Sequence, residues 1–191
     1  MRVIAGRYKG RRLKAPAWPG LRPTSDRLKE TLFAILAPIV EGARVLDGYA
    51  GSGALGIEAL SRGAAEVVFV ECDRRAVTLV EDNLRHCGIG SGYVMICGEF
   101  ASVVRQLPAH RRFDLALLDP PYEEPDLEGV LRAAAVRMAP GGTLVLEHAR
   151  RRQAPGRVEA FALVRQVTAG DSALAFFREA AAPAPDVTEG L

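Results

Sequence analysis

Hydrophobic and polar positions along this chain follow two periods, one typical of strands and one typical of helices. Short runs of β-branched and aliphatic residues end at a polar residue, and segments with apolar residues three or four positions apart follow them. The expected helices cover residues 24–37, 54–62, 74–87, 101–107 and 127–138. The expected strands between and after them cover residues 45–47, 67–71, 93–97, 113–119 and 143–147.

This alternation predicts a parallel sheet with helices on both of its faces. Two more expected strands, 158–167 and 173–178, follow without a helix between them. Ala169-Gly170-Asp171 joins them, which indicates a hairpin. The prediction is therefore an α/β fold with a mixed, seven-stranded sheet.

The two ends of the chain depart from the alternating pattern. Residues 2–14 predict a short hairpin, and a proline-rich stretch follows it. We therefore expect a basic N-terminal hairpin or arm over residues 1–22, a main domain over 23–179 and a flexible tail over 180–191.

Composition and charge narrow the class of protein. The chain has 191 residues, of which 49% are apolar and 25% charged, as in one globular domain rather than a disordered or fibrous chain. The net charge of +2 hides an asymmetry, because residues 1–30 carry nine basic and two acidic groups. Such a basic segment is typical of nucleic-acid binding, although a solvated arm that only aids solubility explains it as well.

Several other classes of protein are disfavoured. The apolar runs are too short to cross a bilayer, and the first residues do not resemble a secretory signal, so we expect no membrane partner and a cytoplasmic location. Three widely spaced cysteines and three scattered histidines form no disulfide framework and no metal spacing, so no metal is expected.

A glycine loop (residues 51–56, GSGALG) has the GxGxxG pattern and lies between an expected strand and an expected helix. Glycines there allow a tight turn and a close approach of the backbone to a ligand. The alternative is an ordinary strand-to-helix turn.

Three acids near this loop favour an adenosine-containing ligand. Glu71 ends the next strand and could accept hydrogen bonds from a ribose diol, in NAD as in S-adenosylmethionine. Asp47 ends the strand before the loop and suits a cationic ligand, which favours S-adenosylmethionine. Glu99 could accept from the adenine amino group, next to Phe100, or could simply favour a helix N-terminus; the two roles are compatible.

The DPPY loop (residues 119–122) follows an apolar strand at its carboxyl end, the edge where open α/β sheets bind ligands. The Asp119 carboxylate and the Pro120 carbonyl could accept both N–H bonds of an exocyclic amine and aim its lone pair at a methyl group. Tyr122 offers a flat face for an unpaired base. No cysteine lies in such a loop, which disfavours covalent catalysis.

Longer motifs carry a family resemblance. Residues 22–33 (RPTSDRLKETLF) resemble the RPTsdRvrEtLFn signature of the RsmD-like small-subunit ribosomal RNA guanine-N2 methyltransferases. Residues 45–47 and 50–62 look like that family's cofactor loop, and DPPY looks like its catalytic loop. The order and spacing match over roughly residues 2–178. The first signature is specific to the family, whereas the other two recur in many methyltransferases.

The resemblance implies a class I, Rossmann-like methyltransferase that uses S-adenosylmethionine and releases S-adenosylhomocysteine. The implied substrate is N2 of a single guanine in 16S rRNA, of the (guanine(966)-N(2)) kind, within the small ribosomal subunit or an assembly intermediate; we expect a monomer. The expected catalytic residues are Asp119, Pro120 and Tyr122. The expected cofactor contacts are Asp47, Ala50, Gly51, Ser52, Gly53, Glu71, Cys72, Glu99, Phe100 and Asp119. The expected RNA contacts are Arg7, Lys9, Arg11, Arg12, Arg22, Thr24 and Arg27, although Arg27 could instead pair with Glu30 on its own helix.

Two residues depart from the family's pattern, and three alternative functions stay open. Gly48 stands where the family has a bulky apolar residue, so we expect a looser loop, and Glu99 stands where an aspartate is common. The alternatives are an adenine-N6 or cytosine-N4 methyltransferase, which DPPY fits equally well, a NAD-dependent oxidoreductase, and an RNA-binding module with a vestigial pocket.

Overall fold

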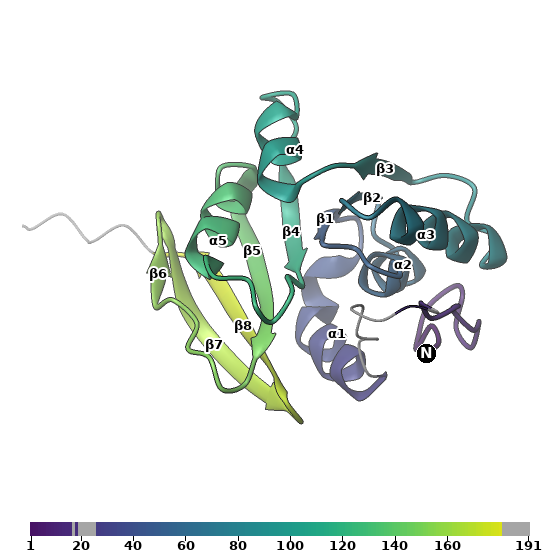
Figure 1. The fold of residues 1–191 in the computed structure, drawn as a ribbon, viewed down its shortest axis with the longest axis horizontal. Coiled ribbons are helices and arrows are strands. Elements are labelled where there is room, and N and C mark those ends of the chain that lie inside the picture. The colour runs from purple at the N-terminus through teal and green to yellow at the C-terminus, as the bar shows by residue number, and fades with distance from the viewer. Residues whose placement is uncertain (17, 19–25, 181–191) are drawn as a thin grey trace, which may run out of the picture.

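The computed structural model describes residues 1–16, 18 and 26–180, and Figure 1 shows its arrangement of helices and strands. The helices are α1 (Asp26–Val40), α2 (Ala54–Ser61), α3 (Arg74–His86), α4 (Phe100–Gln106) and α5 (Leu127–Ala135). The strands are β1 (Arg44–Gly48), β2 (Glu66–Glu71), β3 (Tyr93–Cys97), β4 (Phe113–Leu118), β5 (Met138–Ala149), β6 (Arg157–Val158), β7 (Phe161–Ala169) and β8 (Ser172–Glu179).

All of these strands form one mixed sheet in the order β3-β2-β1-β4-β5-β8-β7-β6. The first five pair in parallel, and β8, β7 and β6 continue the sheet in antiparallel pairs. Along the chain, the connection from β3 to β4 crosses the sheet, so the order of the strands reverses at the boundary between β1 and β4. Open α/β sheets bind their ligands outside the carboxyl ends of the strands at such a switch point.

Two apolar layers cover the sheet, one on each face. On one face α1, α2 and α3 pack against alternate strand residues such as Val45, Leu117 and Val145. On the other face α4 and α5 pack against the intervening residues, such as Leu46 and Leu118. The α/β class and the helices on both faces are therefore confirmed. Among the residues that the structure describes, no helix has the length and apolar character needed to span a membrane.

The sheet has eight strands, so the predicted number of seven was wrong. The single strand expected over residues 158–167 is divided, because the chain reverses at Glu159 and Val158 pairs with Phe161. Glu159 takes the left-handed conformation at φ 51°. A non-glycine residue in that region is uncommon, and the stretch lacks the glycine or asparagine that would have signalled a turn.

Three other boundaries differ from expectation. The first helix extends to Val40 rather than residue 37, and α5 ends at Ala135 rather than residue 138. β5 begins at Met138 rather than residue 143, because Met138 pairs with Phe113 across an irregular register. Residues 24 and 25, the expected start of the first helix, lie outside the described part of the chain.

The N-terminal hairpin (residues 1–14) is docked on the body of the protein. An antiparallel bridge joins Arg2 to Arg12, and Val3 and Leu13 are buried in the core that α1, α2 and α3 share. Figure 1 places this segment beside α2 and α3, on the opposite side of the molecule from β6, β7 and β8. The inner face of the hairpin therefore belongs to the main core; the division predicted at residue 22 stays a prediction.

A buried charge network fastens the start of the hairpin. The Glu58 carboxylate on α2 accepts hydrogen bonds from the backbone N–H groups of Ile4 at 2.8 Å and Ala5 at 3.1 Å. Arg62 Nε donates to the same carboxylate at 2.8 Å, and Lys29 Nζ lies 4.0 Å from it. Burial lowers the pKa of Lys29 even beside this carboxylate. Removing one member of such a network would leave a buried charge without compensation.

A buried amide fastens the other end of the hairpin. Asn83 on α3 accepts from Lys14 N at 2.8 Å and donates to Lys14 O at 3.1 Å. Its Nδ2 also donates to Ser52 O at 2.9 Å. One side chain thus joins the hairpin to the glycine loop.

Candidate functional site

The glycine loop closes around the carboxylate of Asp47. This residue is the second-last of β1 and is almost wholly buried. Asp47 Oδ2 accepts the backbone N–H of Gly56 at 2.8 Å. A Cβ on Gly56 would lie 2.7 Å from that oxygen and would overlap the Phe69 ring, so only glycine allows α2 to approach the sheet this closely. Burial, which is the largest cause, raises the pKa of Asp47 to about 8, and nearby Glu71 adds to the shift.

A second carboxylate, Glu71, holds both the glycine loop and the turn after β2. Its Oε2 accepts from Gly51 N at 2.9 Å, and its Oε1 accepts from Cys72 N at 2.8 Å and Asp73 N at 2.9 Å. Ala50 N donates to Val70 O at 3.1 Å beside it. The carboxyl ends of β1 and β2 are therefore tied together by backbone amides that point at one buried acid.

The remaining loop residues take the places that the pattern predicts. Gly53 precedes α2 in the left-handed conformation, at φ 76°, which costs glycine little. Ser52 is held through its carbonyl by Asn83, and its hydroxyl lies 3.8 Å from Met1 Sδ. The structure thus brings Asp47, the glycine loop and Glu71 to one edge of the sheet, as expected.

The departure at Gly48 has a structural explanation, and it does not leave a loose loop. A Cβ at Gly48 would lie 2.5 Å from Phe100 Cε2 and 2.9 Å from Leu118 Cδ2. The Phe100 ring occupies the space and packs against Tyr49, with ring centroids 5.0 Å apart. Tyr49 itself takes the left-handed conformation at φ 63°, a strain that clusters at functional sites.

Cys72 follows β2, and Glu99 lies just after the neighbouring strand β3. Glu99 caps α4, because its two carboxylate oxygens accept from Ala101 N at 2.9 Å and Ser102 N at 2.7 Å. The helix-capping role is therefore confirmed, and the contact with adenine stays a prediction. Cys72 is an exposed residue, but its thiol is partly desolvated. This partial burial, followed by the charge of Glu71, raises the pKa of Cys72.

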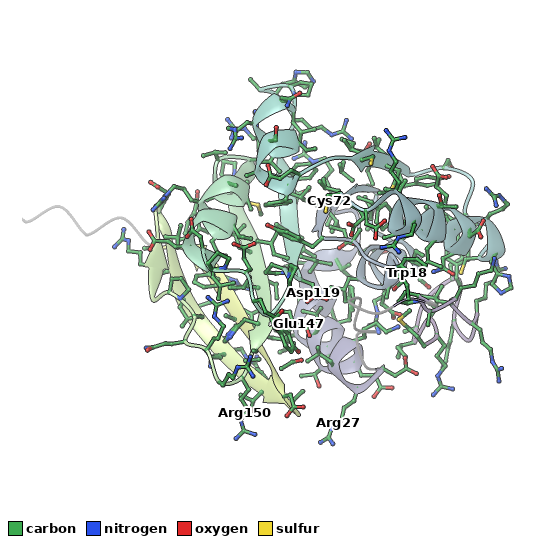
Figure 2. All side chains as sticks on the ribbon, in the orientation of Figure 1. Trp18, Arg27, Cys72, Asp119, Glu147 and Arg150 are labelled. Atoms are coloured by element: carbon green, nitrogen blue, oxygen red, sulfur yellow. The ribbon has the colours of Figure 1, made fainter. Side chains whose placement is uncertain are left out.

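The DPPY loop begins where β4 ends, on the other side of the switch point. Asp119 N donates to Gly48 O at 3.3 Å, so the loop starts beside β1. Its carboxylate is half-buried and lies next to Glu147 at the end of β5, as Figure 2 shows. Burial raises the pKa of Asp119 well above its usual range, and the charges of Glu147 and Asp47 raise it further. Pro120 is buried below it.

Contacts that sequence reasoning missed hold the DPPY loop from the antiparallel edge of the sheet. The Tyr122 hydroxyl and Ser172 Oγ are 2.6 Å apart. The Arg152 guanidinium donates to the carbonyl oxygens of Tyr122, at 3.2 Å, and Glu124, and reaches that of Pro125 at 3.5 Å. These partners are 27 to 50 residues apart in sequence, and no local motif signals them.

The expected RNA-binding residues fall into two groups. Arg7, Lys9, Arg11 and Arg12 are exposed on the hairpin, where the guanidinium carbons of Arg7 and Arg11 lie 5.7 and 5.3 Å from the centroid of the Tyr8 ring. Arg27 is exposed on α1 and points away from the molecule in Figure 2, and it forms no ion pair with Glu30. The expected contacts at Arg22 and Thr24 lie outside the described residues.

In the described part of the chain, no three histidine, cysteine, aspartate or glutamate side chains gather in an arrangement that could hold a metal ion. The site instead consists of carboxylates, backbone amides and an aromatic loop at one sheet edge. That arrangement can accept hydrogen bonds and hold a cation or an amine.

Comparisons with known proteins agree with this geometry. The family model described as "Conserved hypothetical protein 95" matches residues 1–178. The Bacillus subtilis protein named "Putative rRNA methyltransferase YlbH" is 37% identical over 94% of this chain and 99% of its own length. The Escherichia coli "Ribosomal RNA small subunit methyltransferase D" is 41% identical over 67% of this chain, a match that spans 63% of that protein. The solved structure "Putative methyltransferase yhhF from Escherichia coli" is 32% identical, with a TM-score of 0.81 over 94% of this chain and 97% of its own.

The raised pKa of Asp47 predicts how stability depends on pH. The folded chain holds a proton on Asp47 up to about pH 8, whereas an unfolded aspartate loses it near about pH 4. Between these values the free energy of unfolding should fall by about 1.4 kcal/mol per pH unit from this group alone. Asp47→Asn should remove that part of the slope in urea unfolding measured at several pH values. Asp114→Asn, at an exposed carboxyl whose pKa is lowered, should leave the slope in this window unchanged; an equal slope in Asp47→Asn and the parent chain would contradict the prediction.

The packing of Phe100 predicts the outcome of adding a methyl group at residue 48. Gly48→Ala should lower the free energy of unfolding by about 1–3 kcal/mol, because the new Cβ overlaps the Phe100 ring. In the double variant with Phe100→Ala the total loss should be smaller than the sum of the single losses, since the overlap disappears. Urea unfolding of the three variants measures this coupling, and strict additivity would contradict the explanation given for Gly48.

Proposed function

The chain belongs to the family described as Conserved hypothetical protein 95, the RsmD-like family, and on that basis we propose that it transfers a methyl group from S-adenosylmethionine to N2 of a guanine in small-subunit ribosomal RNA. One observation carries the proposal. The DPPY loop starts at the switch point of the sheet, hydrogen-bonded to Gly48 and next to the buried carboxylates that hold the glycine loop. A methyl donor and an amine bound at these two places would meet at one edge.

The residues of the glycine-loop side fit S-adenosylmethionine. That group supplies an electrophilic methyl carbon on a sulfonium when it is bound. Asp47 is a buried acid whose charged form is held back by desolvation, so a nearby cation would stabilise it. Glu71 presents a carboxylate beside the backbone of residues 51 and 72, where ribose hydroxyl groups could donate. Cys72, Glu99 and Phe100 line the adjoining edge, where the adenine ring is proposed to lie.

The DPPY side fits an exocyclic amine. The Asp119 carboxylate and the Pro120 carbonyl accept the two N–H bonds and orient the nitrogen lone pair toward the methyl donor. Two consecutive prolines restrict the backbone, so these acceptors keep their positions. The raised pKa of Asp119 suits it to take up the proton that the nitrogen loses after methylation. Tyr122 stacks on the base while its hydroxyl stays fixed by Ser172.

Ribosomal RNA as the substrate is supported by the names of the relatives and by the charge of the hairpin. Exposed arginine and lysine side chains along its outer face would meet phosphates, which supply affinity without reading sequence. The selected base would be one presented by the folded RNA, within the small subunit or an assembly intermediate. We propose that the protein acts as a monomer in the cytoplasm.

Asp119 gives the direct test of catalysis. Asp119→Ala should reduce the rate of methyl transfer by about 100-fold to 1,000-fold, because it removes an acceptor that orients the amine and takes its proton. Labelled S-adenosylmethionine with unmodified small subunits and with naked 16S rRNA, followed by mass mapping of the product, measures rate and position together. Binding of S-adenosylhomocysteine should survive in the variant. Undiminished turnover would refute the role.

The basic hairpin gives a test of RNA binding. Deleting residues 1–14 should weaken RNA binding and leave cofactor affinity unaffected, but the deletion would also remove the buried Val3 and Leu13. Replacing Arg7, Lys9, Arg11 and Arg12 by alanine keeps the packed face. The slope of log affinity against log salt should become shallower by about one per lost phosphate contact. Arg132→Ala on α5 serves as a control, and an unchanged slope in the hairpin variant would exclude this surface.

A further inference from the structure

Glu147 lies near the carboxyl end of β5, two residues before Ala149, and it neighbours Asp119 across the β4–β5 pair. In the parallel pair of β4 and β5, Leu117 faces Val145 and Leu118 faces Leu146, so the next residues on the two strands are Asp119 and Glu147. Neighbouring strands lie about 4.8 Å apart. Figure 2 shows the two side chains together between the sheet and α1.

Both carboxylates point to the same face of the sheet. Side chains alternate along a strand, and Leu117 and Val145 pack in the core shared with α1. Asp119 and Glu147 follow each of them by two positions and therefore share that face, as Asp47 does on β1, two positions after Val45. Glu147 is only 6% exposed, so its side chain is shielded from the surrounding solvent.

This placement is costly for the fold. Burial imposes a desolvation penalty on the charged form of Asp119, and repulsion from the neighbouring Glu147 adds to it; together they raise the pKa of Asp119. Such arrangements cluster at functional sites, where a ligand compensates for the cost. A ligand that brings two adjacent N–H donors would satisfy both acids at once.

Guanine is the base that offers this pattern next to its amine. Its Watson–Crick edge carries the exocyclic N2 amine and, beside it, a protonated N1. Adenine and cytosine carry an amine as well, but the adjacent ring nitrogen, N1 or N3, is an acceptor. On the basis of the proposed function, we infer that Glu147 is a specificity-determining residue that accepts the N1–H of the target guanine while Asp119 holds its amine.

The same contact would reject the other bases. An ionised carboxylate facing the lone pair of a ring nitrogen is repelled and loses its hydrogen bond, and sites built on such bonds discriminate strongly against analogues that lack the donor. Guanine selectivity would then arise from the end of β5, and the DPPY loop would supply only the amine contact that many amino-methyltransferases share.

The test replaces the target guanine by 2-aminopurine, which keeps the exocyclic amine but has an unprotonated N1. Small subunits reconstituted with 16S rRNA ligated to carry either base at the mapped position serve as substrates, and kcat/KM is measured for each. The parent enzyme should prefer guanine by about 100-fold or more. In Glu147→Gln the amide N–H can donate to the bare N1, so this preference should fall by about tenfold or more. The loss of O6 in the analogue affects both enzymes equally and cancels in the comparison.

Controls separate recognition from structure. Glu81→Gln, the same change on the exposed face of α3, should keep the preference of the parent enzyme. A purely structural role of Glu147 would lower kcat/KM for both bases by the same factor and leave the preference unchanged, which would overturn the inference while guanine-N2 methylation stands. If the parent enzyme instead methylates adenine N6 or cytosine N4 in the mapped product, the proposed function and the inference both fail.

Discussion

Two buried carboxylates at the carboxyl ends of β1 and β2 are the constraint on which the rest of the structure depends. Asp47 takes an amide from the start of α2, and Glu71 takes amides from the glycine loop and from the turn after β2. A carboxyl group that is buried away from water requires hydrogen-bond donors from the protein, and backbone N–H groups at tight turns supply them here. These hydrogen bonds fix the shape of the loop. The raised pKa of Asp47 and the close packing of Gly56 both follow from the burial of this carboxylate.

The hairpin is connected to this centre by polar side chains on α2 and α3. Asn83 bonds to both Lys14 and Ser52, and Glu58 on α2 holds the amides of Ile4 and Ala5. A surface proposed to bind RNA phosphates is thus fixed to the elements that carry the glycine loop. Fully satisfied buried networks of this kind specify one arrangement, because each partner would be costly to leave unpaired.

The sequence predicts the class of fold and the strand-end positions of the two candidate loops, and physical reasons explain where other predictions fail. Period and turn residues locate the parallel strands, and the glycine loop and DPPY have their expected strand-end context. The reversal at Glu159 escapes prediction because it uses no turn residue. The meeting of Asp119 with Glu147 depends on strand register, and the Arg152 and Ser172 contacts depend on long-range pairing. The Gly48 departure becomes clear only when Phe100 is seen to fill its place.

The anchoring of the DPPY loop by Arg152 and Ser172 has a consequence for biosynthesis. These partners are translated 30 and 50 residues after Tyr122, so a growing chain contains the loop long before it contains the groups that hold it. β8, which carries Ser172, is the last strand that the structure describes, so the loop proposed to hold the base gains this anchor only after β8 has been synthesised.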